Sequence, residues 1–570
     1  MKSPNSNKPS AVSRQPDVFG SQQSAFSFHP SAFLVLLIFG ALLCALSTFF
    51  FNVSSAQAQT PSPSESAQSR SLTPQERRGK AIYLRGASAS GREMTALMGE
   101  IDVPASTLTC AGCHGVEGQG KTEGGVTAGN LTWQHLVKPY GHTHPSGRKH
   151  GAFDEASFIR ALTTGIDPSG NTLLVAMPRY RMSAEDLADL VAYLKRIETD
   201  RDPGLAETTI RVGTQLPSTG ALADTGRAMR EVLTAYFDDV NSRGGIYNRK
   251  IELRFSDAGA EPAASAAALK RFLQDEQIFA LVSGVTAGAD REIAAVVGAE
   301  EVPLVGASTL TPPFGFPLNR YAFYLLPGFR EQGRALVNFA ATKPELKKTP
   351  AAVIYLDSPL NSEAAASIEE QAKKSGWTIV LKQPYAREKF DAAALVSTLR
   401  ERGAGAVFFL GGGGTEKAFM QESARVGWTP SVFLLGALVA QDLLAAVPPV
   451  FQDKIFLSFP TVPSDITPAG MQEFRALLEK HKLAPRHTAA QLSAFAAAKL
   501  LIEGLQRAGR DVSREKLVTA LEGLYDFETG LTPRLTFGPN RRVGAQGAYM
   551  VTIDTEKKQF VAAAGWVAAN

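Results

Sequence analysis

The pattern of apolar and polar positions divides the chain into three stretches: an N-terminal apolar run, a part that begins and ends with a predicted helix, and a longer part from residue 209 onward. Residues 32–51 form an apolar run without a charge. Residues 184–198 repeat apolar side chains at the helical period, which predicts an amphipathic helix. Another helix is predicted over 74–84, with Thr73 as its cap and Pro74 in its first turn. From residue 209 onward short apolar runs alternate with helical patterns, which indicates a different kind of domain.

The first apolar run indicates export. It is about as long as the hydrocarbon core of a membrane requires, and Ala56-Gln57-Ala58 matches a signal peptidase site. We expect residues 1–58 to be a cleaved signal peptide, or alternatively a membrane anchor, followed by a polar linker over 59–72. In both cases the rest of the chain is periplasmic, and in the second it is anchored to the inner membrane. Cys44 follows Leu43 rather than a small residue, so a lipoprotein signal is not expected.

Length and composition predict several folded domains. At 570 residues the chain is too long for one core. Its hydrophobic share of 44% and charged share of 20% are typical of globular proteins. The net charge of +4 is not concentrated in a basic cluster, which argues against a nucleic-acid partner.

Two of the three cysteines form a motif for haem attachment. Residues 110–114 read Cys-Ala-Gly-Cys-His, in which Cys110 and Cys113 bind the two vinyl groups of one haem and His114 binds its iron. The alternative is a redox disulfide, which normally begins a helix within a βαβ unit. The glycine-rich surroundings do not fit such a unit. We therefore predict one covalent haem c with His114 as an axial ligand.

Two methionines are candidates for the sixth position on the iron. Met182 precedes the predicted helix cap Ser183, where it is placed to pack on Leu187 as a hydrophobic staple. Met177 precedes Pro178, which favours an extended backbone and leaves its side chain free of a helix. We predict Met177 as the second axial ligand. A thioether ligand raises the reduction potential and is typical of electron transfer.

Residues 78–83 and 190–194 resemble the packed terminal helices of class I cytochromes c. The resemblance implies a small all-α cytochrome c fold over residues 73–200. In that family a small residue on the first helix lets an aromatic residue of the last helix approach closely, and here Gly79 and Tyr193 stand in these places.

Two features of this part leave alternatives open. Residues 86–109 are inserted before the haem cysteines, where the family has only a few residues, and they either cover the haem edge or shape a docking face. His142, His144 and His150 are candidate metal ligands or alternative axial ligands. Their loop, 138–150, is rich in glycine, proline and basic residues, so we interpret it as solvated surface.

After a short polar linker around 199–207, strands and helices alternate. Such alternation predicts parallel sheets in an α/β architecture. The predicted strands cover residues 209–216, 250–256, 279–283, 303–306, 351–357, 378–381, 406–410, 431–435 and 454–458.

Several stretches here resemble the leucine/isoleucine/valine-binding protein family, the type I periplasmic receptors of ABC importers. The matching residues are 214–220, 241–246, 406–413, 419–427 and 535–540. The resemblance implies a two-lobed α/β periplasmic-binding-protein type I fold over 207–568, with a small ligand between the lobes. Lobe one is expected over about 208–327 and 461–530, and lobe two over about 328–460 and 531–568.

The candidate ligand site lies in loops at the carboxyl ends of the predicted strands, where open α/β sheets bind ligands. These loops are polar and lead into helix N-termini, which favour an anion. The alternative is that their serines and threonines only cap helices. The candidate residues are Ser218, Ser283, Thr286, Gly288, Ser308 and Thr309.

Departures from the family bear on the ligand. Amino-acid-binding members hold the ammonium group with an acidic residue just after the strand at 431–435, but here no acid occurs before Asp442. Because a buried unpaired ammonium is costly, we expect a less polar acid, an aromatic compound or an alcohol-like metabolite. The glycines at 411–414 lack the Lys-Ser/Thr of a phosphate loop. No Ser/His/Asp arrangement indicates a hydrolase, so we expect no enzyme.

The leading hypothesis is a periplasmic electron-transfer protein combined with a solute-binding module. One alternative is an electron-transfer subunit of a periplasmic dehydrogenase, with the receptor-like module used for docking. Another is an ABC importer receptor with an accessory haem. The partners implied are a small organic ligand, a periplasmic redox partner and an ABC permease.

Overall fold

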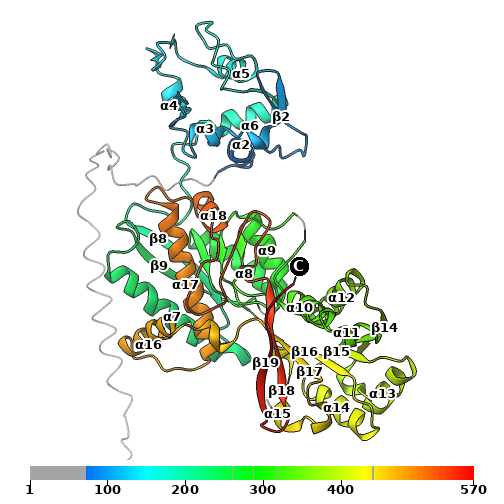
Figure 1. The fold of residues 1–570 in the computed structure, drawn as a ribbon. Helices are drawn as coiled ribbons and strands as arrows, with labels where there is room; N and C mark the ends of the chain where they lie inside the picture. Colours follow the sequence, from blue (N-terminus) through cyan, green and yellow to red (C-terminus); the bar gives the residue numbers. More distant parts are fainter. Residues whose placement is uncertain (1–71, 260, 287, 316, 440–441, 570) are drawn as a thin grey trace, which may run out of the picture. The chain divides into compact units, whose positions relative to one another are not determined.

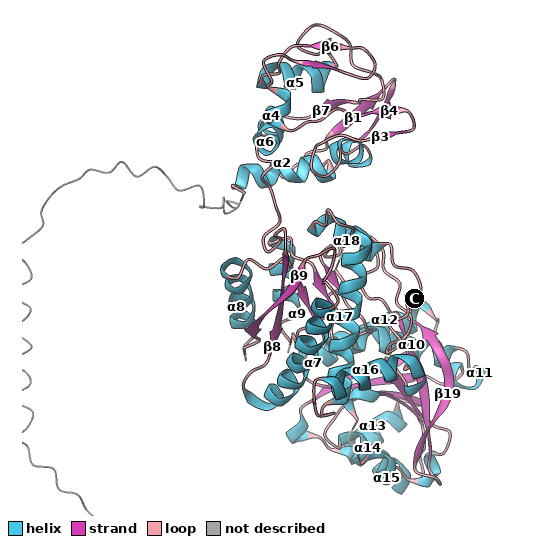
Figure 2. Cartoon of the chain, turned by 90° about the vertical axis from the view of Figure 1, so that its left-hand side faces the viewer, coloured by secondary structure: helices cyan, strands magenta, loops and turns pink. Residues whose placement is uncertain are grey.

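The computed structural model describes residues 72–569, except 260, 287, 316, 440 and 441. The predicted signal segment and nearly all of the predicted linker at 59–72 lie outside the described residues. Within the described part, no helix is both long and apolar enough to cross a membrane. A small N-terminal module is followed in the chain by two α/β lobes (Figures 1 and 2).

Two helices at the ends of the N-terminal module form its frame. They are α2 (Pro74–Arg85) and α6 (Ala184–Leu194). Thr73 accepts a hydrogen bond from the backbone N–H of Glu76, and Ser183 accepts one from Asp186, each at 3.2 Å. Both helices therefore begin at their predicted caps.

The two helices cross at Gly79 with no side chain between them. A Cβ atom at this position would lie 2.0 Å from the carbonyl oxygen of Asp189 and 2.7 Å from the Cβ of Tyr193. Beside it, Arg78 donates two hydrogen bonds to the Asp189 carboxylate, at 2.6 and 2.9 Å. The close approach predicted for Gly79 and Tyr193 is confirmed.

The insertion at 86–109 adds a small sheet to the predicted helical fold. It contains β1 (Thr95–Met98) and β2 (Ile101–Pro104). Strand β1 also pairs with β7 (Arg179–Arg181), giving the order β2-β1-β7. The insertion therefore braces the segment that follows Met177. The other elements of the module are β3 (Thr122–Glu123), β4 (Val126–Thr127), β5 (His142–Thr143), β6 (Lys149–His150), α3 (Cys110–His114), α4 (Trp133–Leu136) and α5 (Glu155–Thr164).

The first lobe is built on a five-stranded parallel sheet in the order β12-β11-β10-β8-β9. Successive residues point to opposite faces. Ala280 and Val282 therefore pack with helices α7 and α17, whereas Leu281 packs with α8 and α9 (Figure 2). The elements are β8 (Thr209–Leu216), β9 (Lys250–Asp257), β10 (Ala280–Val282), β11 (Leu304–Val305), β12 (Ala322–Phe323), α7 (Ala223–Ser242), α8 (Pro262–Asp275), α9 (Asp290–Ala299), α16 (Pro468–Lys480), α17 (Thr488–Ala508) and α18 (Arg514–Glu522).

The second lobe has a seven-stranded sheet in the order β14-β13-β15-β16-β17-β18-β19. Strands β13 to β17 run parallel, and β18 and β19 are antiparallel. Phe408 packs with α10 and α12 on one face, and Phe409 packs with α13 and α14 on the other. The elements are β13 (Ala351–Leu356), β14 (Ile379–Tyr385), β15 (Ala406–Leu410), β16 (Ser431–Leu435), β17 (Ile455–Phe459), β18 (Gly547–Asp554), β19 (Gln559–Ala568), α10 (Phe329–Ala341), α11 (Pro344–Lys347), α12 (Pro359–Lys374), α13 (Ala392–Glu401), α14 (Thr415–Arg425) and α15 (Leu443–Ala446).

Each predicted strand of the two lobes corresponds to an observed one, whereas β12, β18 and β19 were not predicted. The segment 531–545, expected in lobe two, contributes Leu535, Phe537 and Ala545 to the core of the first lobe. Tyr324 of that lobe holds the segment through two backbone hydrogen bonds of 2.8 Å. This long-range pairing determines where the segment packs.

Replacing Gly79 by Ala is expected to destabilise the N-terminal module by about 1–3 kcal/mol, because the added methyl group forces α2 and α6 apart. Urea unfolding followed by haem absorbance measures this change. Gly151→Ala is the control, since a Cβ atom there would meet no other atom within 4 Å. An equal decrease in the free energy of unfolding in the two variants would contradict the importance of the helix crossing.

Candidate functional site

A cavity of about 1040 Å³ in the N-terminal module brings together the predicted haem-binding residues. Cys110, Cys113, His114 and Met177 all line it, whereas Met182 is not among the described lining residues. The donor set of two thiols, an imidazole and a thioether matches that of a covalently attached haem with two axial ligands. The residues present therefore fit haem c.

His114 is oriented for iron binding by the main chain. Its Nδ1 lies 2.6 Å from the carbonyl oxygen of Gly129. When Nδ1 carries the proton and donates to that carbonyl, Nε2 is free to bind metal. Burial lowers the pKa of His114, which favours the neutral form that metals require.

The environment of the cysteines argues against a redox dithiol. Burial raises the pKa of the Cys110 thiol to about 12, so its thiolate is scarce at neutral pH. A reactive redox cysteine needs a lowered pKa and access to solvent. Cys113 is exposed, and Thr109 caps the short helix α3 that carries both residues. The arrangement favours haem attachment.

The loop that carries Met177 is held by a side chain that the sequence did not indicate. The guanidinium of Arg179 donates to the carbonyl oxygen of Met177 and, at 2.9 Å, to that of Leu173. Arg179 is also the first residue of β7, which pairs with β1. The inserted strands and this arginine together position the methionine at the cavity wall.

The histidine-rich loop, interpreted from the sequence as solvated surface, is exposed over much of its length, but its histidines lie against the cavity. His150 is buried, and its Nε2 lies 2.9 Å from Nε2 of His144. Burial, followed by the positive charge of Arg148, lowers the pKa of His144 to about 4. Histidines 135, 142, 144 and 150 all line the haem cavity. Among the described residues, no group of three or more His, Cys, Asp or Glu side chains could hold a metal ion.

The predicted ligand loops of the first lobe meet beyond the ends of β10 and β11. The N–H of Ser308 donates to the carbonyl oxygen of Gly284 at 2.9 Å, and Thr286 is buried beside them. Ser283 is fully buried with a left-handed backbone (φ +55°), and within the described residues its hydroxyl has no hydrogen-bond partner. A small cavity of about 20 Å³ adjoins it. Among the residues that the structure describes, Ser283 therefore keeps an unpaired hydroxyl beside a space the size of one water molecule.

Asp290 organises these loops and was missed from the sequence. It is buried at the start of α9, and its carboxylate accepts hydrogen bonds from Thr309 and, at 3.0 Å, from Thr311. The hydroxyl of Thr309 thus donates to Asp290, and its oxygen accepts a hydrogen bond from the backbone N–H of Thr311 at 2.9 Å. The signal in the sequence that could have indicated this role is an acidic residue two positions after Gly288.

The other predicted residues have more local roles. The backbone N–H of Ser218 donates to the Asp257 carboxylate at 2.9 Å, and Ser218 itself is exposed. Gly288 has a left-handed backbone before α9 (φ +90°). Ser308 shares a hydrogen bond of 3.2 Å with Ser493. Ser218, Gly288 and Ser308 therefore stabilise the conformation of the loops.

Comparison with known proteins identifies both modules. The family model of periplasmic binding proteins matches residues 209–559, and that of cytochrome c matches residues 105–198. Leu/Ile/Val-binding protein homolog 8 of Brucella abortus (strain 2308) is 26% identical over 349 residues, covering 58% of this chain and 85% of the relative. Homolog 7 of the same strain is 26% identical over 341 residues, covering 57% and 84%.

The two lobes are also similar to solved structures. A branched chain amino acid ABC transporter from Thermus thermophilus with bound valine aligns with a TM-score of 0.50 and 16% identity, covering 64% of this chain and 97% of that one. An ABC transporter permease from the Pseudomonas fluorescens group aligns with a TM-score of 0.51 and 18% identity, covering 64% and 94%. At these identities the likeness shows the fold alone.

Replacing Met177 by Leu is expected to remove the red absorption band that a thioether gives to ferric haem, and to lower the reduction potential. Absorption spectra and a potentiometric titration of the purified chain measure both effects. Met182→Leu is the matched control and should leave both unchanged. Loss of the band only in the Met182 variant would show that Met182, and not Met177, binds the iron.

Proposed function

The chain belongs to the periplasmic binding protein family and contains a cytochrome c domain, and we propose that it is a periplasmic receptor that carries one haem c for electron transfer. The joining of a haem-binding cavity and a solute-binding fold in one polypeptide carries this proposal. Solute-binding relatives bind small molecules without transforming them, and we infer the same of this receptor part. An N-terminal signal would export the chain to its redox partner in the periplasm.

The electron-transfer part of the proposal rests on the residues around the cavity. Haem c supplies reversible one-electron chemistry when bound. Cys110 and Cys113 would attach it, and His114 and Met177 would bind its iron. A filled coordination sphere leaves no position for a substrate, which favours electron transfer over catalysis at the metal. The carbonyl oxygen of Gly129 orients the imidazole of His114, and Arg179 holds the main chain at Met177.

The ligand is proposed to be a small organic molecule other than an ordinary α-amino acid. After β16 the chain continues as Gly436–Leu438, a short helical turn without an acidic residue. The next carboxylate along the sequence, Asp442, accepts hydrogen bonds from Lys417 at 2.7 and 2.8 Å. That carboxylate is therefore already paired. The loops of the first lobe carry the hydroxyl of Ser283, unpaired within the described residues, and N–H groups at the start of α9, which suit a carboxylate or hydroxyl group.

A thermal-shift screen of the full chain tests the receptor function. A ligand at about 100 times its dissociation constant stabilises the folded state by about 2.7 kcal/mol, enough to raise the melting temperature by several degrees. We expect hits among small organic acids, aromatic compounds or alcohols, and none among α-amino acids. An increase in the melting temperature caused only by α-amino acids would contradict the proposed ligand class.

Ser283→Ala provides the site-specific control for any hit. It should reduce the ligand-induced shift, because it removes a buried hydroxyl at the candidate site. Ser423→Ala is matched to it, since Ser423 is equally buried in α14 and, in the described part of the chain, its hydroxyl also lacks a partner. A broad panel without any shift would leave the receptor function unsupported.

A further inference from the structure

The connector between the haem module and the first lobe is tied down at several points. Asp202 accepts a hydrogen bond from the backbone N–H of Arg514 at 2.5 Å. The carbonyl of Gly204 accepts one from Arg211 at 2.8 Å, and a Cβ atom at Gly204 would lie 2.3 Å from the carbonyl oxygen of Gln277. The predicted polar linker around 199–207 is therefore a structured segment packed on the lobe.

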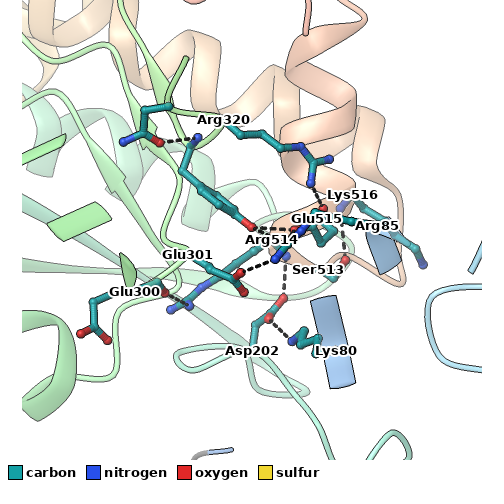
Figure 3. Close-up of polar contacts among 12 residues, drawn as sticks. Lys80, Arg85, Asp202, Glu300, Glu301, Arg320, Ser513, Arg514, Glu515 and Lys516 are labelled. Atoms are coloured by element: carbon teal, nitrogen blue, oxygen red, sulfur yellow. Dashed lines mark hydrogen bonds and ion pairs between the residues drawn. The ribbon is translucent and has the colours of Figure 1, made fainter. Parts of the chain in front are cut away.

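Arg514 provides a rigid base for this connector. It lies at the start of α18 and is 8% exposed. Its guanidinium donates to the carbonyl oxygens of Ile278 and Phe279, at 2.6 and 3.0 Å. It also donates to that of Glu300, at 3.1 Å (Figure 3). Because a buried charge is costly unless its donors are paired, these bonds restrict Arg514 to one position. Asp202 is therefore held against the core of the lobe.

Helix α2 of the haem module adds two cations to the same place. Lys80 Nζ lies 2.7 Å from Asp200 and 3.7 Å from Asp202, and its side chain is 15% exposed. Arg85 pairs with Glu301 at 3.0 Å and lies 3.6 Å from Glu515 (Figure 3). Partly buried ion pairs are screened less by salt than exposed ones. We call the residues Lys80, Arg85, Asp200, Asp202, Glu301 and Glu515 the seam.

Two members of the seam lie at the ends of helices that lead to the functional sites: Arg85 ends α2, and Glu301 follows α9. On α2, the hydroxyl of Tyr83 donates to the carbonyl of Gly115 at 2.6 Å, one residue after the axial ligand His114. In the first lobe, α9 begins at Asp290 beside the ligand loops and ends just before Glu300 and Glu301. Each site is therefore connected to the seam by a single helix.

We propose that the seam fixes the haem module to the first lobe, so that the two move as one body. The haem then keeps a constant position relative to the ligand loops at Ser283 and Ser308. When a ligand draws the lobes together, the second lobe moves relative to both. This inference does not require the ligand to be known, so it can fail or hold independently of the proposed receptor function.

Pulsed EPR distances in the full, haem-loaded chain test the proposal. Spin labels are attached at Gln75→Cys on α2 and Ala267→Cys on α8, both exposed positions, in a chain that also carries Cys44→Ser. We expect one narrow distance distribution. Arg85→Glu should abolish the narrow peak, because it places a negative charge beside Glu301 and Glu515. A broad distribution in the parent chain would overturn the proposal.

Two further variants separate the seam from general damage. Arg181→Glu disrupts an exposed pair with Asp102 inside the haem module and should leave the narrow peak in place. Arg85→Glu combined with Glu301→Arg should restore the peak by exchanging the charges. Unchanged haem absorbance and an unchanged far-UV circular dichroism spectrum show that both the haem module and the lobes of each variant are folded. A narrow peak in Arg85→Glu, or its absence from the charge-exchanged chain, would overturn the role of the seam.

Discussion

The close crossing of α2 and α6 at Gly79 is the contact on which the haem module depends. No side chain fits between Gly79 and the main chain of Asp189, so the two helices lock at one position. The same short helix carries Tyr83, which reaches the main chain beside the haem-binding motif, and Arg85, which reaches the first lobe. A single element thus links the fold of the module, its haem site and its attachment to the receptor.

Around the haem site, the protein supplies orientation rather than chemistry of its own. The carbonyl oxygen of Gly129 fixes the imidazole of His114, and Arg179 with the inserted strands holds the loop of Met177. In the receptor part, Asp290 plays a comparable role for the threonines of the ligand loops. Both sites therefore depend on neighbouring residues that orient the predicted binding residues.

Local signals in the sequence predicted much of this arrangement. Helix caps such as Thr73 and Ser183, the haem motif and the buried strands depend on residues close together in the chain. The strands β1 and β7, the packing of 531–545 in the first lobe and the pairing of Arg85 with Glu301 depend on residues far apart. Periodicity contains no information about such partners. The buried position of His150 is not predictable in this way either, because the loop that carries it is polar and largely exposed.

Intact-mass spectrometry of the exported, denatured chain tests most directly whether one polypeptide carries a haem beside its receptor lobes. Thioether bonds survive denaturation, so haem bound through Cys110 and Cys113 must remain with the chain. The predicted result is a mass equal to the polypeptide plus one haem. A mass equal to the polypeptide alone, or to the polypeptide plus more than one haem, would contradict it.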